Sequence, residues 1–388
     1  MNSLVIKNAL LCDHRQTIKS DLRIDRGKII DISPSLKDEH ILDASNLIVM
    51  PACIDLNIQI KNHSHSNLLS IQDKAQRGGV GTIVLDSLPD QVETLKFFNT
   101  QSHITFISSA IPFTLETIQN LSTMHHDGAS SISIQSSTPN DALKCIYEYA
   151  QFLNLSCLCN LNHSFGGVSA QSPMSFKMGL SQIPPFVEEL EFSKFFCLAN
   201  HFRVPTLIRA LSEKNLFLQT KTTPWIQSEI SIHHLLLNEE KIAHYDPWAK
   251  LTPPLMTKEI QDFFHQELIH INMLTSLHRE FSTSSKEQTF EDASSGADCL
   301  EFYFSLLFTE LVKTNLLSLQ ELSAKTSYNQ AQFLHLNQGE ISIGHDANLI
   351  IFDPQESFEI SHPLYGKKTL FGKIKAILSP KTGLHKVN

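Results

Sequence analysis

The chain is poor in several features that would indicate a particular class of protein. Charged residues make up only 18% of its 388 residues, and acidic side chains outnumber basic ones, for a formal net charge of −9. This balance argues against a protein that binds nucleic acid or a membrane surface. No uninterrupted apolar run approaches the ~18 residues of a membrane-spanning helix, and no signal peptide is visible. We therefore expect a soluble cytoplasmic protein.

Cysteine pairs and nucleotide-binding motifs are also missing. The seven cysteines are dispersed, several lie within apolar runs, and none forms a C-x-x-C pair. Buried, reduced thiols are thus expected rather than a disulfide framework or a zinc ribbon. No G-x-G-x-x-G motif or P-loop follows an expected strand, which argues against a nucleotide cofactor. What the chain does have is 19 histidines, a number that suggests a metal enzyme.

Strand signals at both ends of the chain flank a long alternating middle. Short apolar runs separated by turn residues fill 3–50, and strand–turn–strand patterns recur in 339–353 and near 373–378. These patterns predict one small β-sandwich domain built from residues 1–51 and 339–388.

The middle of the chain, residues 52–338, alternates strand-like and helix-like segments. Roughly eight such repeats favour a (β/α)8 barrel of the α/β class over an open doubly wound sheet. The expected strands are 54–60, 82–85, 104–108, 131–134, 155–159, 194–199, 216–220 and 270–275. The expected helices include 68–77, 91–98, 140–152 and 205–213.

Several segments, in order along the whole chain, resemble the dihydroorotases of the amidohydrolase superfamily. Pro51-Ala-Cys-Ile-Asp55-Leu-Asn57-Ile-Gln59 is similar to the superfamily pattern Pro-Gly-x-Ile-Asp-x-His-x-His. His233-His234-Leu-Leu-Leu-Asn-Glu-Glu, Thr252-Pro-Pro-Leu255 and Gly344-His-Asp-Ala-Asn-Leu-Ile-Ile-Phe-Asp353 resemble segments specific to dihydroorotases. The resemblance implies a barrel joined to a β-sandwich. It also implies a zinc-dependent reaction, the reversible closure of carbamoyl-aspartate to dihydroorotate.

At the positions that the resemblance assigns to zinc ligands, this chain has amides. The two histidines of the first barrel strand are replaced by Asn57 and Gln59, and a later ligand by Asn160. A further ligand histidine corresponds to Asn200 or, with a one-residue shift, His201. Neutral amides are poor zinc ligands beside imidazole or thiolate. We therefore expect no zinc and no other cofactor, although zinc is the family norm.

The remaining site positions are altered as well. The bridging lysine or aspartate is missing from the segment that contains Gln135, and Ser276 stands in place of the catalytic aspartate, so no catalytic residue is intact. By the same resemblance, Lys61 replaces the arginine that holds the substrate carboxylate, and Thr252 replaces a substrate-binding asparagine. Lys61 and Thr252 are accordingly the candidate substrate-binding residues. The pair His233-His234 is expected to support a loop rather than bind metal.

Two other sites are conceivable from the sequence. His63 and His65, with His163 or His201, could form a displaced metal site, although solvated loop histidines are the simpler explanation. Cys157 or Cys159 could act as a nucleophile with His163, but nothing in the sequence lowers a thiol pKa there.

The sequence thus predicts a non-catalytic, dihydroorotase-like protein of pyrimidine biosynthesis. In the family such homologues support aspartate carbamoyltransferase, so we expect a scaffold for that enzyme and a homo- or hetero-oligomer, with no nucleic-acid or membrane partner. The alternatives are an active dihydroorotase or other cyclic amide hydrolase with an altered metal site, and a sensor that binds a pyrimidine precursor through Lys61.

Overall fold

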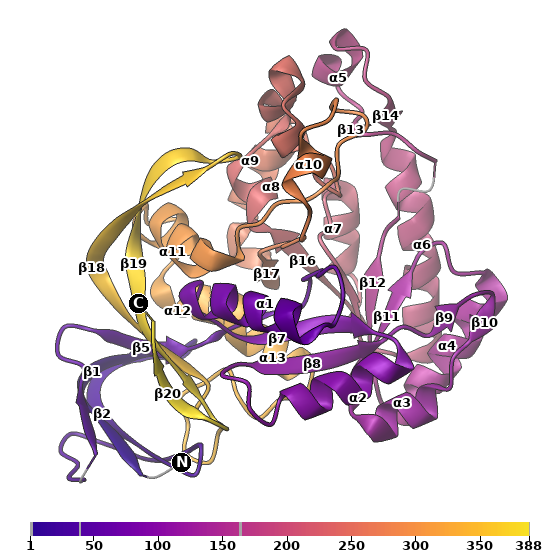
Figure 1. The fold of residues 1–388 in the computed structure, drawn as a ribbon. Helices are drawn as coiled ribbons and strands as arrows, with labels where there is room; N and C mark the ends of the chain where they lie inside the picture. The colour runs from indigo at the N-terminus through magenta and orange to yellow at the C-terminus, as the bar shows by residue number, and fades with distance from the viewer. Residues whose placement is uncertain (1–2, 39, 163–164, 388) are drawn as a thin grey trace.

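The computed structural model describes residues 3–38, 40–162 and 165–387, and its centre is a barrel of parallel strands (Figure 1). Eight strands follow one another in chain order around the sheet, each parallel to its neighbour. They are β6 (Cys53–Asp55), β7 (Val80–Ser87), β8 (Thr105–Ala110), β11 (Ala129–Gln135), β12 (Ser156–Asn160), β15 (Thr206–Ile208), β16 (Ile226–Ser231) and β17 (Met273–Thr275).

The gap between the first and last strands is bridged just beyond their carboxyl ends. The amide of Gln59 donates to the carbonyl of His278 at 2.9 Å, and the amide of Glu280 donates to the carbonyl of Gln59 at 3.0 Å. Deeper in, Asp55 accepts from the Thr275 hydroxyl at 2.7 Å and from the Ser276 amide at 2.9 Å. The segments after β6 and β17 therefore lie side by side at the barrel mouth.

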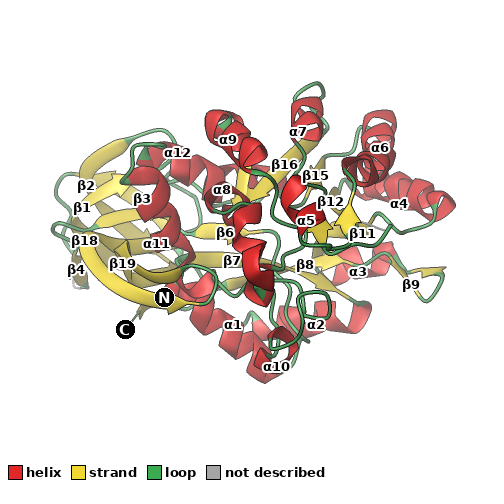
Figure 2. Cartoon of the chain, turned by 90° about the horizontal axis from the view of Figure 1, so that it is seen from above, coloured by secondary structure: helices red, strands yellow, loops and turns green. Residues whose placement is uncertain are grey.

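Helices surround the barrel and cover the outer faces of its strands (Figure 2). The main ones are α1 (His65–Arg77), α2 (Pro89–Phe98), α3 (Leu121–Asp127), α4 (Asn140–Leu153), α6 (Pro185–Phe202), α7 (Lys214–Thr220), α8 (Ile232–Leu236), α9 (Lys258–Gln266) and α11 (Tyr303–Leu307). A large apolar core lies between helices and strands. A second cluster joins Ile54, Val84 and Leu158 of the strands to Ala331 and Phe333 of α13 (Asn329–Phe333). This cluster fills part of the barrel interior.

Two predicted strands and one predicted helix were wrong. The predicted strand 194–199 lies within the helix α6, and 216–220 lies within the helix α7. The predicted helix 205–213 instead contains the strand β15. β15 has only three residues, all buried, so it carries no alternating pattern by which a strand could be recognised. α6 begins with Pro185 at its first turn, a position that proline favours, and extends for 18 residues.

Strands from both ends of the chain form one separate sheet. Its order is β20-β19-β18-β5-β1-β2-β3, with β4 paired to β1. The strands are β1 (Leu4–Cys12), β2 (Thr17–Asp25), β3 (Lys28–Ser33), β4 (Ile41–Asp43), β5 (Ile48–Pro51), β18 (Leu349–His362), β19 (Gly366–Ser379) and β20 (Gly383–Lys386). The predicted barrel with a terminal β unit is thus confirmed. The exact domain limits, 1–51 with 339–388 and 52–338, stay a prediction.

The antiparallel strands β18 and β19 are longer than the sequence patterns predicted, and β19 packs against the barrel helix α11. Each strand has 14 residues, and the Ser305 hydroxyl of α11 donates to the carbonyl of Gly372 in β19 at 2.9 Å. None of the helices among the described residues has the length and apolar character needed to cross a membrane.

Candidate functional site

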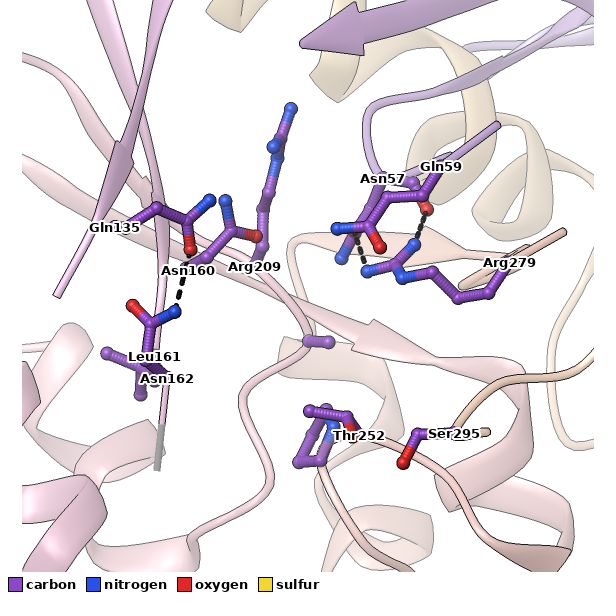
Figure 3. A pocket seen from close by; sticks show the side chains of 12 residues that line it. Asn57, Gln59, Gln135, Asn160, Leu161, Asn162, Arg209, Thr252, Arg279 and Ser295 are labelled. Atoms are coloured by element: carbon purple, nitrogen blue, oxygen red, sulfur yellow. Dashed lines mark hydrogen bonds between the residues drawn. The ribbon is translucent and has the colours of Figure 1, made fainter. Parts of the chain in front are cut away.

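A polar cavity of about 250 Å³ opens at the carboxyl ends of the barrel strands (Figure 3). This end of a parallel barrel is where active sites form, because the loops after all eight strands meet there. Five amide side chains line it: Asn57, Gln59, Gln135, Asn160 and Asn162. The other polar lining residues are Arg209, Arg279, Thr252 and Ser295. None of the described residues that line this cavity is an aspartate, glutamate, histidine or cysteine.

Four of the residues singled out from the sequence come together here. Asn57 and Gln59 follow β6, Asn160 ends β12, and Thr252 approaches from the loop before α9. In Figure 3, Gln135 and Asn160 lie on one side of the cavity, whereas Asn57 and Gln59 lie on the other, beside Arg279. Their roles, as replaced ligand positions and as a substrate contact, stay predictions.

Asn200 does not belong to this site, and its assignment to a ligand position is corrected. It lies near the end of α6, outside the barrel wall, where its amide nitrogen donates to the carbonyl of Phe196 and its oxygen accepts from Thr223. The neighbouring His201 is exposed on the same helix. Since the strand at this point of the barrel is β15, the residue at its carboxyl end is Arg209.

Lys61 and Ser276 also lie outside the cavity lining. Lys61 is exposed, and its backbone amide donates to the carboxylate of Glu280 at 3.1 Å. Ser276 is fully buried, and its hydroxyl oxygen accepts from the amide of His278 at 3.2 Å. A carboxylate clamp at Lys61 therefore does not face the same cavity as Asn57 and Asn160.

Arg279 forms hydrogen bonds to Asn57, which follows the first barrel strand β6. Its guanidinium donates to the side-chain oxygen of Asn57 at 2.6 Å and to the Asn57 carbonyl at 2.8 Å. The amide nitrogen of Asn57 in turn donates to Glu229 of β16 at 2.5 Å. Glu229 is buried, and desolvation raises the pKa of its carboxyl to about 8. Arg279, Asn57 and Glu229 therefore form one hydrogen-bonded chain across the barrel mouth.

Arg209 forms a second charged group in the barrel interior. Its side chain is only 3% exposed, and its Nη1 atom donates to both carboxylate oxygens of Asp86, at 2.8 and 3.1 Å. The same nitrogen lies 3.3 Å from the hydroxyl of Ser133 in β11. Arg209, which directly follows β15, thus connects this strand to β7 and β11 and at the same time lines the cavity.

The side chains that line the cavity do not fit the zinc ion that the fold family implies. The strand ends offer neutral amides and two guanidinium groups, and guanidinium has no lone pair to donate and carries a positive charge. Within the described residues, no group of three or more histidine, cysteine, aspartate and glutamate side chains is placed to hold a metal ion.

The displaced sites considered from the sequence find no support in the described residues. His65 is exposed in the first turn of α1. His63 is more buried, and both of its ring nitrogens lack a hydrogen-bond partner among the described residues. His163 lies outside the described residues. Cys157 and Cys159 are fully buried, and desolvation raises the pKa of both thiols, to about 12 for Cys159. Such thiols are poor nucleophiles.

His233 and His234 have the contacts of structural residues. Both are buried. His233 lies 2.7 Å from the hydroxyl of Tyr365 through Nδ1, and Nε2 of His234 lies 3.1 Å from the carbonyl of Pro254. They connect the end of β16 with two loops.

Sequence reasoning missed Arg209, Arg279 and Glu229. The nearest signal was Arg279, four residues after Thr275 in the segment that the resemblance marks as catalytic. Arg209 was hidden because β15 was taken for a helix. Nothing in the sequence paired either arginine with Asp86 or Asn57, which lie more than a hundred residues away.

Comparisons with known proteins agree with this architecture. No family model matches the chain. A probable dihydroorotase-like protein of Helicobacter pylori is 28% identical over 399 residues, covering 99% of both chains. A dihydroorotase of Carboxydothermus hydrogenoformans is 25% identical, covering 95% of this chain and 91% of its own length. Among solved structures, an L-hydantoinase (dihydropyrimidinase) from Arthrobacter aurescens has a TM-score of 0.88 at 18% identity, covering 100% and 97%. The resemblance seen in the sequence is thereby confirmed over the full length.

Proposed function

We propose that this dihydroorotase-like protein of the amidohydrolase fold is non-catalytic and takes part in pyrimidine biosynthesis as a scaffold for aspartate carbamoyltransferase. The proposed lack of catalytic activity is supported by the lining of the barrel mouth, where amides and arginines lie at the strand ends.

The chemistry of ring closure explains why this lining argues against activity. Hydrolysis of a cyclic amide near neutral pH needs a metal that generates hydroxide and a carboxylate or imidazole that moves the proton. Asn57, Gln59 and Asn160 supply neither a strong ligand nor a base. The positive charge of Arg279, 2.6 Å from the Asn57 oxygen, would also repel Zn²⁺.

The first prediction concerns metal content and turnover measured on one preparation. We expect less than one equivalent of zinc per chain, and dihydroorotate turnover at least ~10³-fold slower than that of a dihydroorotase with intact ligands, because both hydroxide generation and proton transfer are lost. Metal analysis and an absorbance assay in both directions would measure this. Stoichiometric zinc with chelator-sensitive turnover would instead identify an active cyclic amide hydrolase with an altered site.

Exposed phenylalanine side chains within residues 165–186 support the proposed interaction with aspartate carbamoyltransferase. Phe165 is 64% exposed, Phe176 of α5 (Pro173–Lys177) is 81% exposed, and Phe186 at the start of α6 is 48% exposed. Phe165 and Phe186 pack edge to face with ring centroids 5.6 Å apart. Exposed aromatic side chains that pack together, as Phe165 and Phe186 do, typically mark a protein-binding surface. In Figure 1 the α5 region stands away from the terminal sheet.

The second prediction tests this surface. We expect the protein and the aspartate carbamoyltransferase of the same organism to elute together on size-exclusion chromatography. The double substitution Phe165→Ser/Phe176→Ser should weaken the complex at least tenfold, because both rings are solvent-exposed anchors. Phe97→Ser in α2, which is 72% exposed, is the matched control and should leave the complex unchanged. Independent elution, with transferase activity unaffected, would contradict the scaffold proposal.

A further inference from the structure

A second, smaller cavity of about 50 Å³ lies where the start of α6, the start of α7 and the loop before α9 meet. It and the cavity at the barrel mouth have no described lining residue in common. We infer that the smaller cavity binds the ammonium group of an alkylamine, the group that ends a lysine side chain, through the carboxylates of Glu188 and Glu213. This inference goes beyond the proposed function and does not depend on it.

The lining of this cavity is acidic. Glu188 and Glu213 are only 5% and 4% exposed, and none of the described lining residues is a lysine, arginine or histidine. Lys214, the next residue along the chain, donates instead to Glu259 of α9 at 2.6 Å. Desolvation raises the pKa of Glu213, and the nearby carboxylate of Glu188 raises it further. A bound cation would oppose both effects, because an opposite charge favours the ionised form of a carboxyl group.

One buried carboxylate oxygen in this cavity lining has no hydrogen-bond donor among the described residues. The two oxygens of Glu188 accept from the amide and the hydroxyl of Ser212, at 3.1 and 2.8 Å. In Glu213, Oε1 accepts from the backbone and side-chain nitrogens of Asn215, at 3.4 and 3.2 Å, whereas no described donor reaches Oε2. A buried acceptor left without a donor is costly, so Oε2 of Glu213 calls for a ligand that donates.

Apolar side chains form much of the remaining wall and indicate the shape of the ligand. They include Ile183 of β14 (Gln182–Ile183), Met256 and Ile260. An ammonium group is compact and carries three donors on an apolar stem, whereas guanidinium is a wider planar fork. A metal ion fits less well, because the described residues contain no group of three or more acidic, histidine or cysteine side chains placed to hold one.

The test compares two probes that have the same carbon chain. n-Butylamine is an ammonium ion at neutral pH, whereas 1-butanol is uncharged and of similar size. In ligand-observed NMR titrations we expect n-butylammonium to bind at least tenfold more tightly than 1-butanol, because the alcohol cannot form charge-assisted hydrogen bonds of the same strength. This comparison uses the unaltered protein, so it does not depend on the folding of a variant.

Two substitutions locate the binding. Glu213→Gln should raise the Kd of n-butylammonium at least tenfold, because the unpaired charge is removed. Glutamine keeps a side-chain oxygen that can accept from Asn215, so the cap of α7 is retained. Glu189→Gln is the matched control, since Glu189 is exposed on α6 and does not line the cavity. It should change the Kd by less than about twofold, because exposed charges are screened.

The same variant distinguishes a lysine of a partner protein from a free amine. Pro185 lines the cavity and directly precedes Phe186, so a protein bound to the Phe165–Phe186 pair could insert a lysine there. In that case Glu213→Gln should weaken the complex with aspartate carbamoyltransferase, and n-butylammonium should compete with that complex. An unchanged complex, with n-butylammonium binding still lost in Glu213→Gln, would identify a free amine as the ligand.

Three results would overturn the inference. The first is an equal Kd for n-butylammonium and 1-butanol, and the second is an equal Kd for n-butylammonium in the wild type and in Glu213→Gln. The third is an equal loss of affinity in Glu213→Gln and Glu189→Gln, which would show a general effect of charge. Independent elution of the protein and the transferase would contradict the scaffold proposal alone and leave this site intact.

Discussion

Replacing Arg209 by methionine is expected to lower the free energy of unfolding by about 3 kcal/mol, the largest effect that we expect from a single substitution in this protein. The side chain is 3% exposed and pairs with Asp86, whose own side chain is 18% exposed. Methionine fills much of the same volume but leaves the Asp86 carboxylate without its partner. Breaking a buried ion pair on one side costs more than the intact pair contributes, because the remaining charge is desolvated and unpaired.

A double-mutant cycle separates this cost from lost packing. Asp86→Asn/Arg209→Met should be less destabilised than the sum of the two single variants, by about 1–3 kcal/mol, since both charges are then removed. Lys144→Met is the matched control, because its pair with Glu148 in α4 is exposed and should change stability by less than ~0.5 kcal/mol. Urea unfolding followed by circular dichroism and tryptophan fluorescence would measure these values. Additive single effects would show that the pair is uncoupled.

Replacing Glu229 by glutamine is expected to stabilise the protein by about 2 kcal/mol at pH 8.5 and to flatten the decline of stability with rising pH. Burial raises the pKa of Glu229 from 4.5 to about 8, against the opposing effect of Arg209. The folded state therefore holds a proton that the unfolded state releases between pH 4.5 and 8. The stabilisation from this proton is complete below pH 4.5 and is lost as the pH rises through 8. Glutamine is neutral throughout, and its side-chain oxygen can still accept from Asn57.

The dependence of stability on pH below 6.5 can be measured in the same experiment and serves as a control. Desolvation lowers the pKa of His233 to about 3 and of His278 to about 4, so both stay neutral in the folded protein while the unfolded chain takes up protons below about pH 6.5. Stability should fall as the pH is lowered from 6.5 in both the wild type and Glu229→Gln. Unfolding midpoints in urea from pH 5 to 9 would show both limbs. An unchanged alkaline slope in the variant would mean that Glu229 is already ionised in the folded protein.

The architecture and part of the candidate site could be predicted from the amino-acid sequence. Repeated strand–helix units, with strand-rich ends, were enough to predict the barrel and the terminal sheet, because these patterns repeat over the whole chain. Asn57, Gln59 and Asn160 were expected at the barrel mouth and do line the cavity there, since they lie at or shortly after the ends of strands whose apolar runs are easily recognised. Alternation along a strand is a local property, and local properties can be read from sequence.

The charged residues that share the barrel interior could be identified only in the folded protein. Asn200 was expected at the strand end where the structure has Arg209. The three residues of β15 are all buried, so the strand shows no alternation of apolar and polar residues, and the strand predicted at 194–199 lies within the helix α6. The pairing of Arg209 with Asp86, and of Arg279 with Asn57 and Glu229, depends on strands closing into a ring. That closure brings residues from distant parts of the chain within hydrogen-bond distance, and it leaves the exposed Lys61 outside the cavity. The loss of histidines could be seen in the sequence, but the arginines that stand in the same barrel mouth could be assigned only from the folded chain.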